Sequence, residues 1–465
     1  MSMKAEEFIS HDEILRTLDY AGNNKDNFKL IDYILDKARC RKGLTHEEAC
    51  ILLACEDVER NEQIFELANE IKKDIYGNRI VMFAPLYLSN YCINGCIYCP
   101  YHRNNKYINR KKLTQTEIIE EVIALQDMGH KRLALELGED PVNNPIEYII
   151  ESIKTIYSIK HKNGSIRRIN LNIAATSIEE YKQILNAEIG TYILFQETYH
   201  KQNYEKLHPT GPKHDYTYHT QAHDRAMQAG IEDVGLGVLF GLDKYMYEFV
   251  ALLMHSEHLE AVFGVGPHTI SVPRVRPATG INSEQFTNGI NDDIFAKIVA
   301  CIRIAMPYTG MIISTRESQE TRKRLLDVGI SQISGGSKTS VGGYAKDGGN
   351  SKQFDIDDNR TLDEIVNWLI KLGYIPSFCT ACYREGRVGD RFMSLCKSGQ
   401  LSNICLPNAL MTLEEYLEDY AESNTINIGR NLIDREINGI PDLNIKELVN
   451  KNLANIKLGK RDFRL

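Results

Sequence analysis

Two groups of three cysteines are the residues in this chain whose type and spacing most clearly indicate chemistry. The first group, Cys92, Cys96 and Cys99, has the spacing C-x3-C-x2-C. The second group has the spacing C-x2-C-x22-C and consists of Cys379, Cys382 and Cys405. Three thiolates bind three irons of a four-iron cluster, whereas a fully coordinated cluster has four protein ligands. Each group therefore predicts an iron–sulfur cluster with one iron open to an outside ligand, which is typical of catalysis.

A structural zinc site is the alternative interpretation of the first group. Structural zinc is held by four protein ligands in a tetrahedron. His102 is the only nearby residue that is able to complete such a set, so the first group fits zinc poorly.

Composition limits the class of protein and its compartment. The 465 residues carry a formal net charge of −8, which argues against broad binding to nucleic acid or to an anionic membrane surface. No apolar run approaches the ~20 residues that span a bilayer, and no apolar core of a signal peptide follows Met1. The 11 cysteines are then typical of reduced thiols or metal ligands, so we expect a cytoplasmic protein.

The elements that must position the first cysteine group follow an α/β pattern, in which short apolar runs alternate with longer amphipathic segments. Eight such units over roughly 250 residues are what a (β/α)8 barrel requires. The expected strands span residues 80–87, 132–137, 169–173, 191–195, 234–240, 269–272, 311–314 and 332–333. The expected helices between them span residues 116–129, 177–186, 218–230, 245–258, 292–305 and 317–328.

Helical periodicity before and after the barrel predicts three parts. We expect an N-terminal helical segment over 1–78, the barrel over 79–345 and a C-terminal helical iron–sulfur domain over 346–465. The first cysteine group then follows the first strand directly. Since barrel enzymes react at the C-terminal ends of their strands, this group is expected on the catalytic face.

The first cysteine motif, placed after a first barrel strand, resembles the radical S-adenosylmethionine (radical SAM) superfamily. The resemblance implies a [4Fe-4S] cluster whose open iron chelates SAM, and a radical from SAM that removes hydrogen from the substrate. Carboxylates near the strand ends suit the SAM ammonium, and an aromatic ring is able to pack on its adenine. The expected SAM contacts are Tyr98, Gly138, Glu139, Gln196 and Glu197. For Gly138 and Glu139, a solvated turn is the alternative.

Further motifs carry a closer resemblance. They are G-E-D-P at 138–141, F-Q-E-T-Y-H at 195–200, G-V-G-P-H-T at 264–269 and the C-terminal C-x2-C-x22-C. Together they are similar to the HydG family, the radical SAM tyrosine lyases of [FeFe]-hydrogenase maturation, from about residue 75 to the C-terminus. The related ThiH lyases of the thiamine pathway share the barrel and the first motif but lack the C-terminal triad.

The HydG resemblance implies a reaction in two stages. L-tyrosine is cleaved at the Cα–Cβ bond to p-cresol and dehydroglycine, and the fragment is converted to CO and cyanide at a second, auxiliary cluster. Both products then ligate an extra labile iron, held by His268, as an Fe(CO)2(CN) synthon for the hydrogenase H-cluster. A flavodoxin or ferredoxin as electron donor and other hydrogenase maturases are the implied partners. A purely structural histidine is the alternative for His268.

Three arginines at strand ends are candidates for the tyrosine carboxylate, because a guanidinium fork suits that group. They are Arg274, Arg276 and Arg316, of which Arg316 is preferred and counted with the catalytic residues. Arginines that only form scaffold salt bridges are the alternative. For the whole chain, the alternatives are a 2-iminoacetate synthase of thiamine biosynthesis and a non-catalytic iron–sulfur scaffold, which predicts no SAM cleavage.

Overall fold

A closed barrel of parallel strands organises the molecule. The structure is a computed structural model that describes residues 4–346, 348–440 and 442–465. The last barrel strand pairs with the first through Val81 and Gln332, which closes the barrel and confirms the predicted (β/α)8 fold. The barrel strands are β1 (Arg79–Ser89), β2 (Arg132–Leu137), β5 (Arg168–Asn172), β6 (Tyr192–Ile193), β7 (Val234–Gly237), β8 (Thr269–Ser271), β9 (Gly310–Ile313) and β10 (Gln332–Ser334).

Each predicted strand overlaps one of these strands, with ends that differ by at most two residues in either direction for β1, β5, β9 and β10, but a further strand was not predicted. Strand β11 (Ile375–Ser377) pairs in parallel with the start of β1, where Arg79 lies opposite Ile375. Its central residue is Pro376, which has no N–H to donate, and a run of three residues gives little periodicity. A small ribbon of β3 (Lys160–His161) and β4 (Gly164–Ser165) also lies outside the barrel.

Helices cover the outside of the barrel, and several begin at reciprocal caps. The Thr114 hydroxyl accepts from the backbone N–H of Glu117, whose carboxylate accepts from the backbone N–H of Thr114. Ser177 and Glu180 repeat this arrangement at a later helix. The helices are α6 (Gln115–Asp127), α7 (Ile146–Ser158), α8 (Ile178–Asn186), α9 (Lys201–Leu207), α10 (Tyr216–Thr220), α11 (Ala222–Gln228), α12 (Tyr245–Phe263), α13 (Asp292–Ala305) and α14 (Gln319–Val328).

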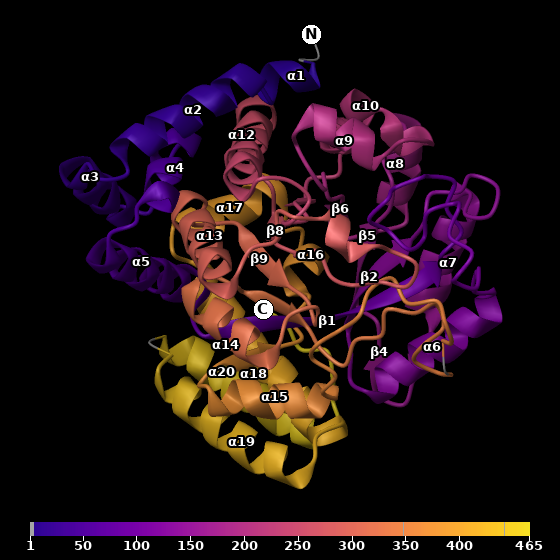
Figure 1. The fold of residues 1–465 in the computed structure, drawn as a ribbon. Helices are drawn as coiled ribbons and strands as arrows, with labels where there is room; N and C mark the ends of the chain where they lie inside the picture. The colour runs from indigo at the N-terminus through magenta and orange to yellow at the C-terminus, as the bar shows by residue number, and fades with distance from the viewer. Residues whose placement is uncertain (1–3, 347, 441) are drawn as a thin grey trace.

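Helices before and after the barrel pack on it from different sides (Figure 1). The N-terminal helices are α1 (Ala5–Phe8), α2 (His11–Asn24), α3 (Phe28–Arg39), α4 (His46–Ala54) and α5 (Val58–Tyr76), and α5 packs on α13 and α14. The C-terminal helices are α15 (Leu362–Lys371), α16 (Ala381–Arg384), α17 (Gly389–Lys397), α18 (Leu401–Asp419), α19 (Ser423–Asn438) and α20 (Leu443–Lys457). Of these, α18 contacts β11 and thereby joins the C-terminal helices to the barrel wall.

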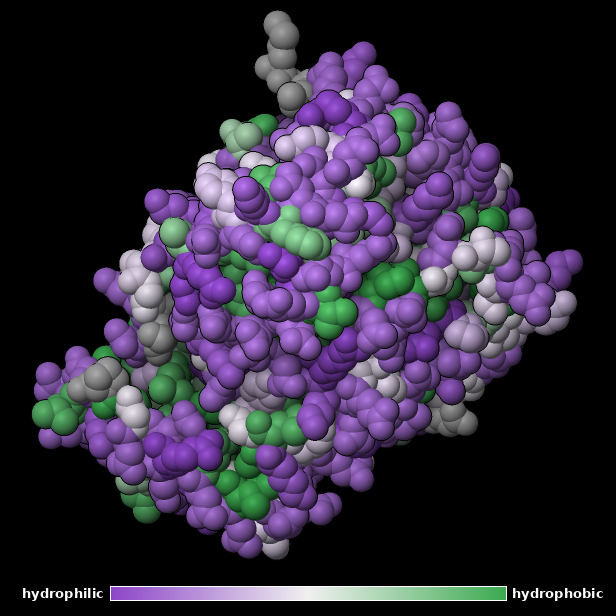
Figure 2. Space-filling view, turned by 60° about the vertical axis from the view of Figure 1, so that its left-hand side comes forward, coloured by the Kyte–Doolittle hydropathy of each residue, from purple (hydrophilic) through white to green (hydrophobic). Residues whose placement is uncertain are grey.

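The surface is mostly hydrophilic. The face in Figure 2 shows apolar side chains only in separate spots between polar ones. Among the exposed apolar side chains are Leu443 and Leu448 of α20 and Leu458, which directly follows that helix. Among the described residues, every helix is too short or too polar to cross a bilayer.

Candidate active site

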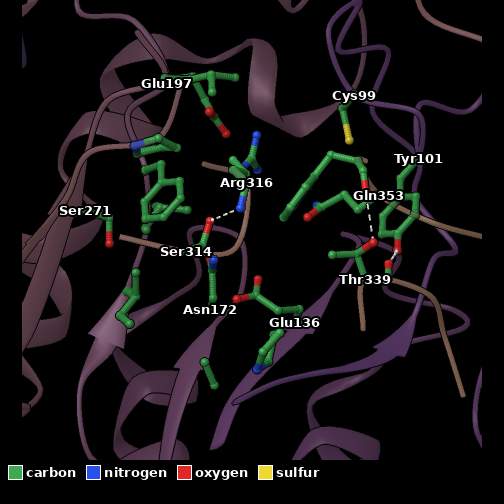
Figure 3. A pocket seen from close by; sticks show the side chains of 18 of the residues that line it. Cys99, Tyr101, Glu136, Asn172, Glu197, Ser271, Ser314, Arg316, Thr339 and Gln353 are labelled. Atoms are coloured by element: carbon green, nitrogen blue, oxygen red, sulfur yellow. Dashed lines mark hydrogen bonds between the residues drawn. The ribbon is translucent and has the colours of Figure 1, made fainter. Parts of the chain in front are cut away.

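A cavity of about 250 Å³ opens among the C-terminal ends of the barrel strands. Its wall is built by residues that end successive strands or follow them, such as Tyr87, Glu136, Asn172, Ser271 and Arg316 (Figure 3). In a parallel barrel all strands finish at the same end, so residues far apart in the chain converge there. The cavity therefore lies where barrel enzymes bind their substrates.

The first cysteine group lies in the loop after β1 and reaches this cavity. Cys96 is buried, while Cys92 and Cys99 are half-buried, and all three line the cavity wall. Backbone bonds hold the loop in place, with Gly95 N–H donating to Thr210 O at 2.9 Å and Ile97 N–H to Leu207 O at 3.0 Å. The loop is thus fixed at both flanks of Cys96.

The chemistry of these three thiols fits an iron–sulfur cluster. Burial raises the pKa of Cys99 to about 12, and the nearby Cys92 thiol raises it further. Burial raises the pKa of Cys92 and of Cys96 as well. Thiols ligate metal as thiolates, so a bound metal centre would supply the positive charge that such a buried set needs in its thiolate form. Among the described residues, no three His, Cys, Asp or Glu side chains are placed to hold a single metal ion.

Gly138 and Glu139 lie directly against the triad loop. A Cβ on Gly138 would lie 2.4 Å from Tyr91 O and 2.9 Å from Cys92 Cβ, so only glycine fits there. The Glu139 carboxylate accepts from Asn94 Nδ2 at 2.6 Å, and burial raises its pKa. Glu139 therefore faces the cavity beside the triad, at the place predicted for the SAM ammonium.

Glu197 is paired with a lysine that the sequence analysis did not select. Lys213 Nζ lies 2.9 Å from Glu197 Oε1, and both side chains are largely buried. Burial alone lowers the pKa of Lys213, but the adjacent Glu197 charge outweighs this and raises it. Lys213 N–H also donates to Asn94 Oδ1 at 2.9 Å, which ties the pair to the triad loop. Lys213 lies in the short 3-10 helix Pro212–His214, and no motif or periodicity of the sequence marks it.

Two of the predicted SAM contacts, Tyr98 and Gln196, differ in whether their side chains line the cavity. The Tyr98 ring lines the cavity, and its hydroxyl lies 2.8 Å from His208 Nε2. Gln196 does not line the cavity, because it is buried and its amide donates to Thr220 Oγ1 at 2.9 Å. The expectation of a SAM contact from Gln196 is corrected accordingly, since its polar group is already satisfied away from the cavity.

The three candidate arginines have different surroundings. Arg274 forms ion pairs with Glu317 and with Asp292 and does not line the main cavity, which corrects its assignment to the substrate. Arg276 lines the cavity, but it pairs with Glu317 at 2.7 Å and so is partly neutralised. Arg316 lines the cavity and belongs to no ion pair among the described residues. Its guanidinium lies 3.6 Å from the centre of the Phe354 ring.

Glu136 is a second charged cavity residue that the sequence analysis did not select. It lies near the end of β2, opposite Asn172 of β5 in the strand register. Burial raises its pKa to about 8, although the charge of Arg316 acts in the opposite direction. No ion pair of the described residues includes Glu136.

The second cysteine group lies near the start of β1, away from the cavity. Cys379 follows β11, Cys382 lies on α16 and the buried Cys405 lies on α18. A hydrogen bond from the Cys382 thiol lowers the pKa of Cys405, and the nearby Arg79 and Arg387 lower it further. These three thiols come together from distant segments, which fits a shared cluster. Their apolar surroundings also include a fourth cysteine, Cys396, which the family spacing skips.

His268 lies beside this second group, just before β8. Its Nε2 is 3.0 Å from the Tyr383 hydroxyl, and its ring centre is 4.7 Å from that of Phe392. Tyr383 is the residue after Cys382, so His268 and the second cysteine group are neighbours. Parallel strands begin at the end of the barrel opposite the cavity, so the two cysteine groups lie at opposite ends.

Comparisons with known proteins agree with this geometry. The Radical SAM superfamily profile matches residues 86–253, and the Biotin and Thiamin Synthesis associated domain matches residues 271–375. A crystal structure of HydG, a maturase of the [FeFe]-hydrogenase, superposes with a TM-score of 0.96 at 54% identity, over 98% of this chain and 100% of that one. This chain belongs to the HydG family.

Other relatives include a second HydG and a related lyase. HydG from Carboxydothermus hydrogenoformans is 39% identical, with a TM-score of 0.85 over 97% of this chain and 100% of that one. The 2-iminoacetate synthase of Escherichia coli (strain K12) is 29% identical over 74% of this chain and 89% of its own length. The predicted family and the radical SAM enzyme class are thereby confirmed, and the radical SAM class implies a [4Fe-4S] cluster that binds SAM.

Proposed function

We propose that this HydG-family enzyme cleaves L-tyrosine at the Cα–Cβ bond to p-cresol and dehydroglycine, and converts the small fragment to CO and cyanide for [FeFe]-hydrogenase maturation. The observation that carries the proposal is a single cavity with the first cysteine group in its wall and the unpaired Arg316 facing into it. A site that holds both a thiolate set and a free guanidinium suits a radical reaction on a carboxylate substrate.

Residues around the first cysteine group are suited to bind SAM. Cys92, Cys96 and Cys99 would hold a [4Fe-4S] cluster, which with bound SAM supplies the one-electron chemistry that starts the reaction. The Glu139 carboxylate, oriented by Asn94, is placed to accept hydrogen bonds from the SAM ammonium. These residues line the same cavity as Arg316, so the cofactor and the substrate are expected in adjacent positions.

The substrate half of the cavity has a cation and aromatic walls. Arg316 is oriented by the Phe354 ring and by a bond from its Nη1 to Arg274 O at 3.4 Å. The Tyr87 hydroxyl donates to Gln353 Oε1 at 2.8 Å, which fixes the orientation of the Tyr87 ring in the cavity wall. We propose that Arg316 binds the carboxylate of L-tyrosine while the enclosed walls exclude water from the reactive intermediate.

The second cysteine group is proposed as the place where the fragment is converted. Cys379, Cys382 and Cys405 would hold the auxiliary iron–sulfur cluster, and His268 would hold the extra labile iron. The Tyr383 hydroxyl, which now contacts His268, would have to release its Nε2. A flavodoxin or ferredoxin as electron donor and other maturases as acceptors of the product remain expectations.

The test is anaerobic turnover of the cluster-loaded enzyme with SAM, dithionite and L-tyrosine. The expected products are 5'-deoxyadenosine, p-cresol and CO, measured in the same reaction. Absence of 5'-deoxyadenosine from a fully loaded enzyme would contradict the radical reaction.

A tyrosine lyase that stops at the imine product is the second candidate. It is favoured by the similarity to the 2-iminoacetate synthase of E. coli. That reaction would give 5'-deoxyadenosine and p-cresol without CO, even when the auxiliary cluster is fully loaded. The CO measurement therefore separates the two candidates.

A further inference from the structure

The charged side chains of the cavity differ in whether they have a partner of opposite charge. Lys213 pairs with Glu197 at 2.9 Å, and Arg276 pairs with Glu317 at 2.7 Å. Three others, Glu136, Glu139 and Arg316, belong to no ion pair among the described residues. An ionisable group in an enclosed site is costly to hold in its charged form unless a ligand supplies the partner of opposite charge. These three groups are therefore the ones left for ligands.

The two unpaired carboxylates lie in different parts of the cavity. Glu139 is bonded to Asn94 of the triad loop and so belongs to the SAM side. Glu136 lies within β2, three residues before Glu139, and is between Tyr87 of β1 and Asn172 of β5 in the strand register. Figure 3 shows Glu136 and Asn172 side by side, with Arg316 on the loop beyond them. Glu136 and Arg316 both line the same cavity, which places them in one compartment.

We propose that Glu136 binds the α-ammonium group of the substrate amino acid while Arg316 binds its α-carboxylate. A free amino acid carries both charges on one carbon, and an unpaired carboxylate and an unpaired guanidinium facing one space are complementary to it. The Asn172 amide orients Glu136 from the next strand. This inference rests on the proposed function for the identity of the substrate and adds the residue that recognises its amino group.

The phenol hydroxyl of tyrosine is the other substrate group that Glu136 is able to accept. Substrate analogues separate the two roles, because each lacks one polar group. Phenylalanine keeps the amino acid charges and lacks the phenol hydroxyl, whereas 3-(4-hydroxyphenyl)propionate keeps the phenol and lacks the amine. The matched protein change is Glu136→Gln, which keeps the shape of the side chain and removes its charge.

The experiment is calorimetric binding to the cluster-loaded enzyme with SAM and without reductant, so that no turnover occurs. We expect Glu136→Gln to weaken the binding of L-tyrosine and of phenylalanine by at least ~10-fold, about 1.4 kcal/mol. The affinity for 3-(4-hydroxyphenyl)propionate should stay unchanged. Glu120→Gln is the control, since Glu120 is a partly exposed carboxylate of α6 whose ion-pair partner among the described residues is Lys346. Iron content and circular dichroism establish that each variant is folded and loaded.

Proton release gives an independent readout. Burial raises the pKa of Glu136 to about 8, so its carboxyl is largely protonated at pH 7 and must ionise to bind an ammonium group. The charged or titratable groups that face it are Arg316, Glu197, Tyr87 and Tyr101. Calorimetry in buffers of different ionisation enthalpy should show up to about one proton more released by the wild type than by Glu136→Gln.

Each other outcome overturns the proposal. Weakening that is confined to ligands with a phenol hydroxyl would assign Glu136 to that group instead. Equally weaker binding of all three ligands would indicate a structural role for Glu136. Unchanged binding of all three would show that Glu136 takes no part in substrate binding. Turnover of the wild-type enzyme tests the proposed function separately. A failure of the Glu136 proposal can therefore be told apart from a failure of the proposed function.

Discussion

At the residue scale, ion pairing separates three arginines that look alike in the sequence. Arg274 and Arg276 share the carboxylate of Glu317, whereas Arg316 points to the ring of Phe354 and keeps its charge free. All three lie at or just after strand ends, so their position in the barrel does not distinguish them. Ion pairs with Glu317, together with Asp292 for Arg274 and Asp357 for Arg276, engage two of the guanidinium groups and leave that of Arg316 available to a carboxylate ligand.

Arg316→Gln tests this assignment. Removing one partner of an enclosed charge pair typically costs 2–5 kcal/mol, so we expect the KM for L-tyrosine to rise by roughly 100-fold. Cleavage of SAM in the absence of tyrosine should stay within about twofold of the wild type. Arg324→Gln is the control, because Arg324 is partly exposed outside the cavity and, among the described residues, its ion-pair partner is Asp293. An equal loss of both activities would place Arg316 in the SAM site.

At the element scale, the contact between β2 and the triad loop depends on one glycine. A side chain at Gly138 would collide with Tyr91 O and Cys92 Cβ, and both belong to the loop that carries the first cysteines. Since backbone atoms cannot move aside cheaply, we expect Gly138→Ala to displace the loop. Iron bound at the first site should fall by at least about half, with SAM cleavage falling in parallel, while the second site keeps its iron.

The control for Gly138→Ala is Gly22→Ala. Gly22 lies within α2, and nothing lies within 4 Å of a Cβ built on it. Alanine is the better helix former by about 1 kcal/mol, so this variant should keep its iron and unfold at an equal or higher temperature. Normal iron content in Gly138→Ala would show that the loop adapts to the methyl group.

The same elements show what the sequence was able to predict. The strands β1 and β2 carry strong apolar runs, and the cysteine spacings are specific, so the barrel and both thiol groups followed from the sequence. Strand β11 was not predicted because it is three residues long and has a central proline. The sequence analysis did not identify Lys213 and Glu136 as cavity residues, because a single charged residue has no periodic signal. Only the fold brings these residues to the cavity.

At the scale of the whole molecule, the two cysteine groups are joined by one strand. Strand β1 begins at Arg79, which is near Cys405, and ends shortly before Cys92. An 11-residue strand spans roughly 30 Å, so the two thiol groups share no ligands and should be able to act separately. In the proposed reaction, the small fragment would have to travel from one end of the barrel to the other.

This separation predicts how loss of the second site divides the reaction. In the double variant Cys379→Ser, Cys405→Ser, the cavity residues are unchanged, so 5'-deoxyadenosine and p-cresol should form within about twofold of the wild-type rates. CO should disappear, and the iron content should fall by at least the ~4 irons of one cluster. Cys40→Ser is the matched control, because Cys40 is an exposed cysteine outside both groups. Loss of p-cresol together with CO would show instead that the second site supports the first, and that the barrel couples its two ends.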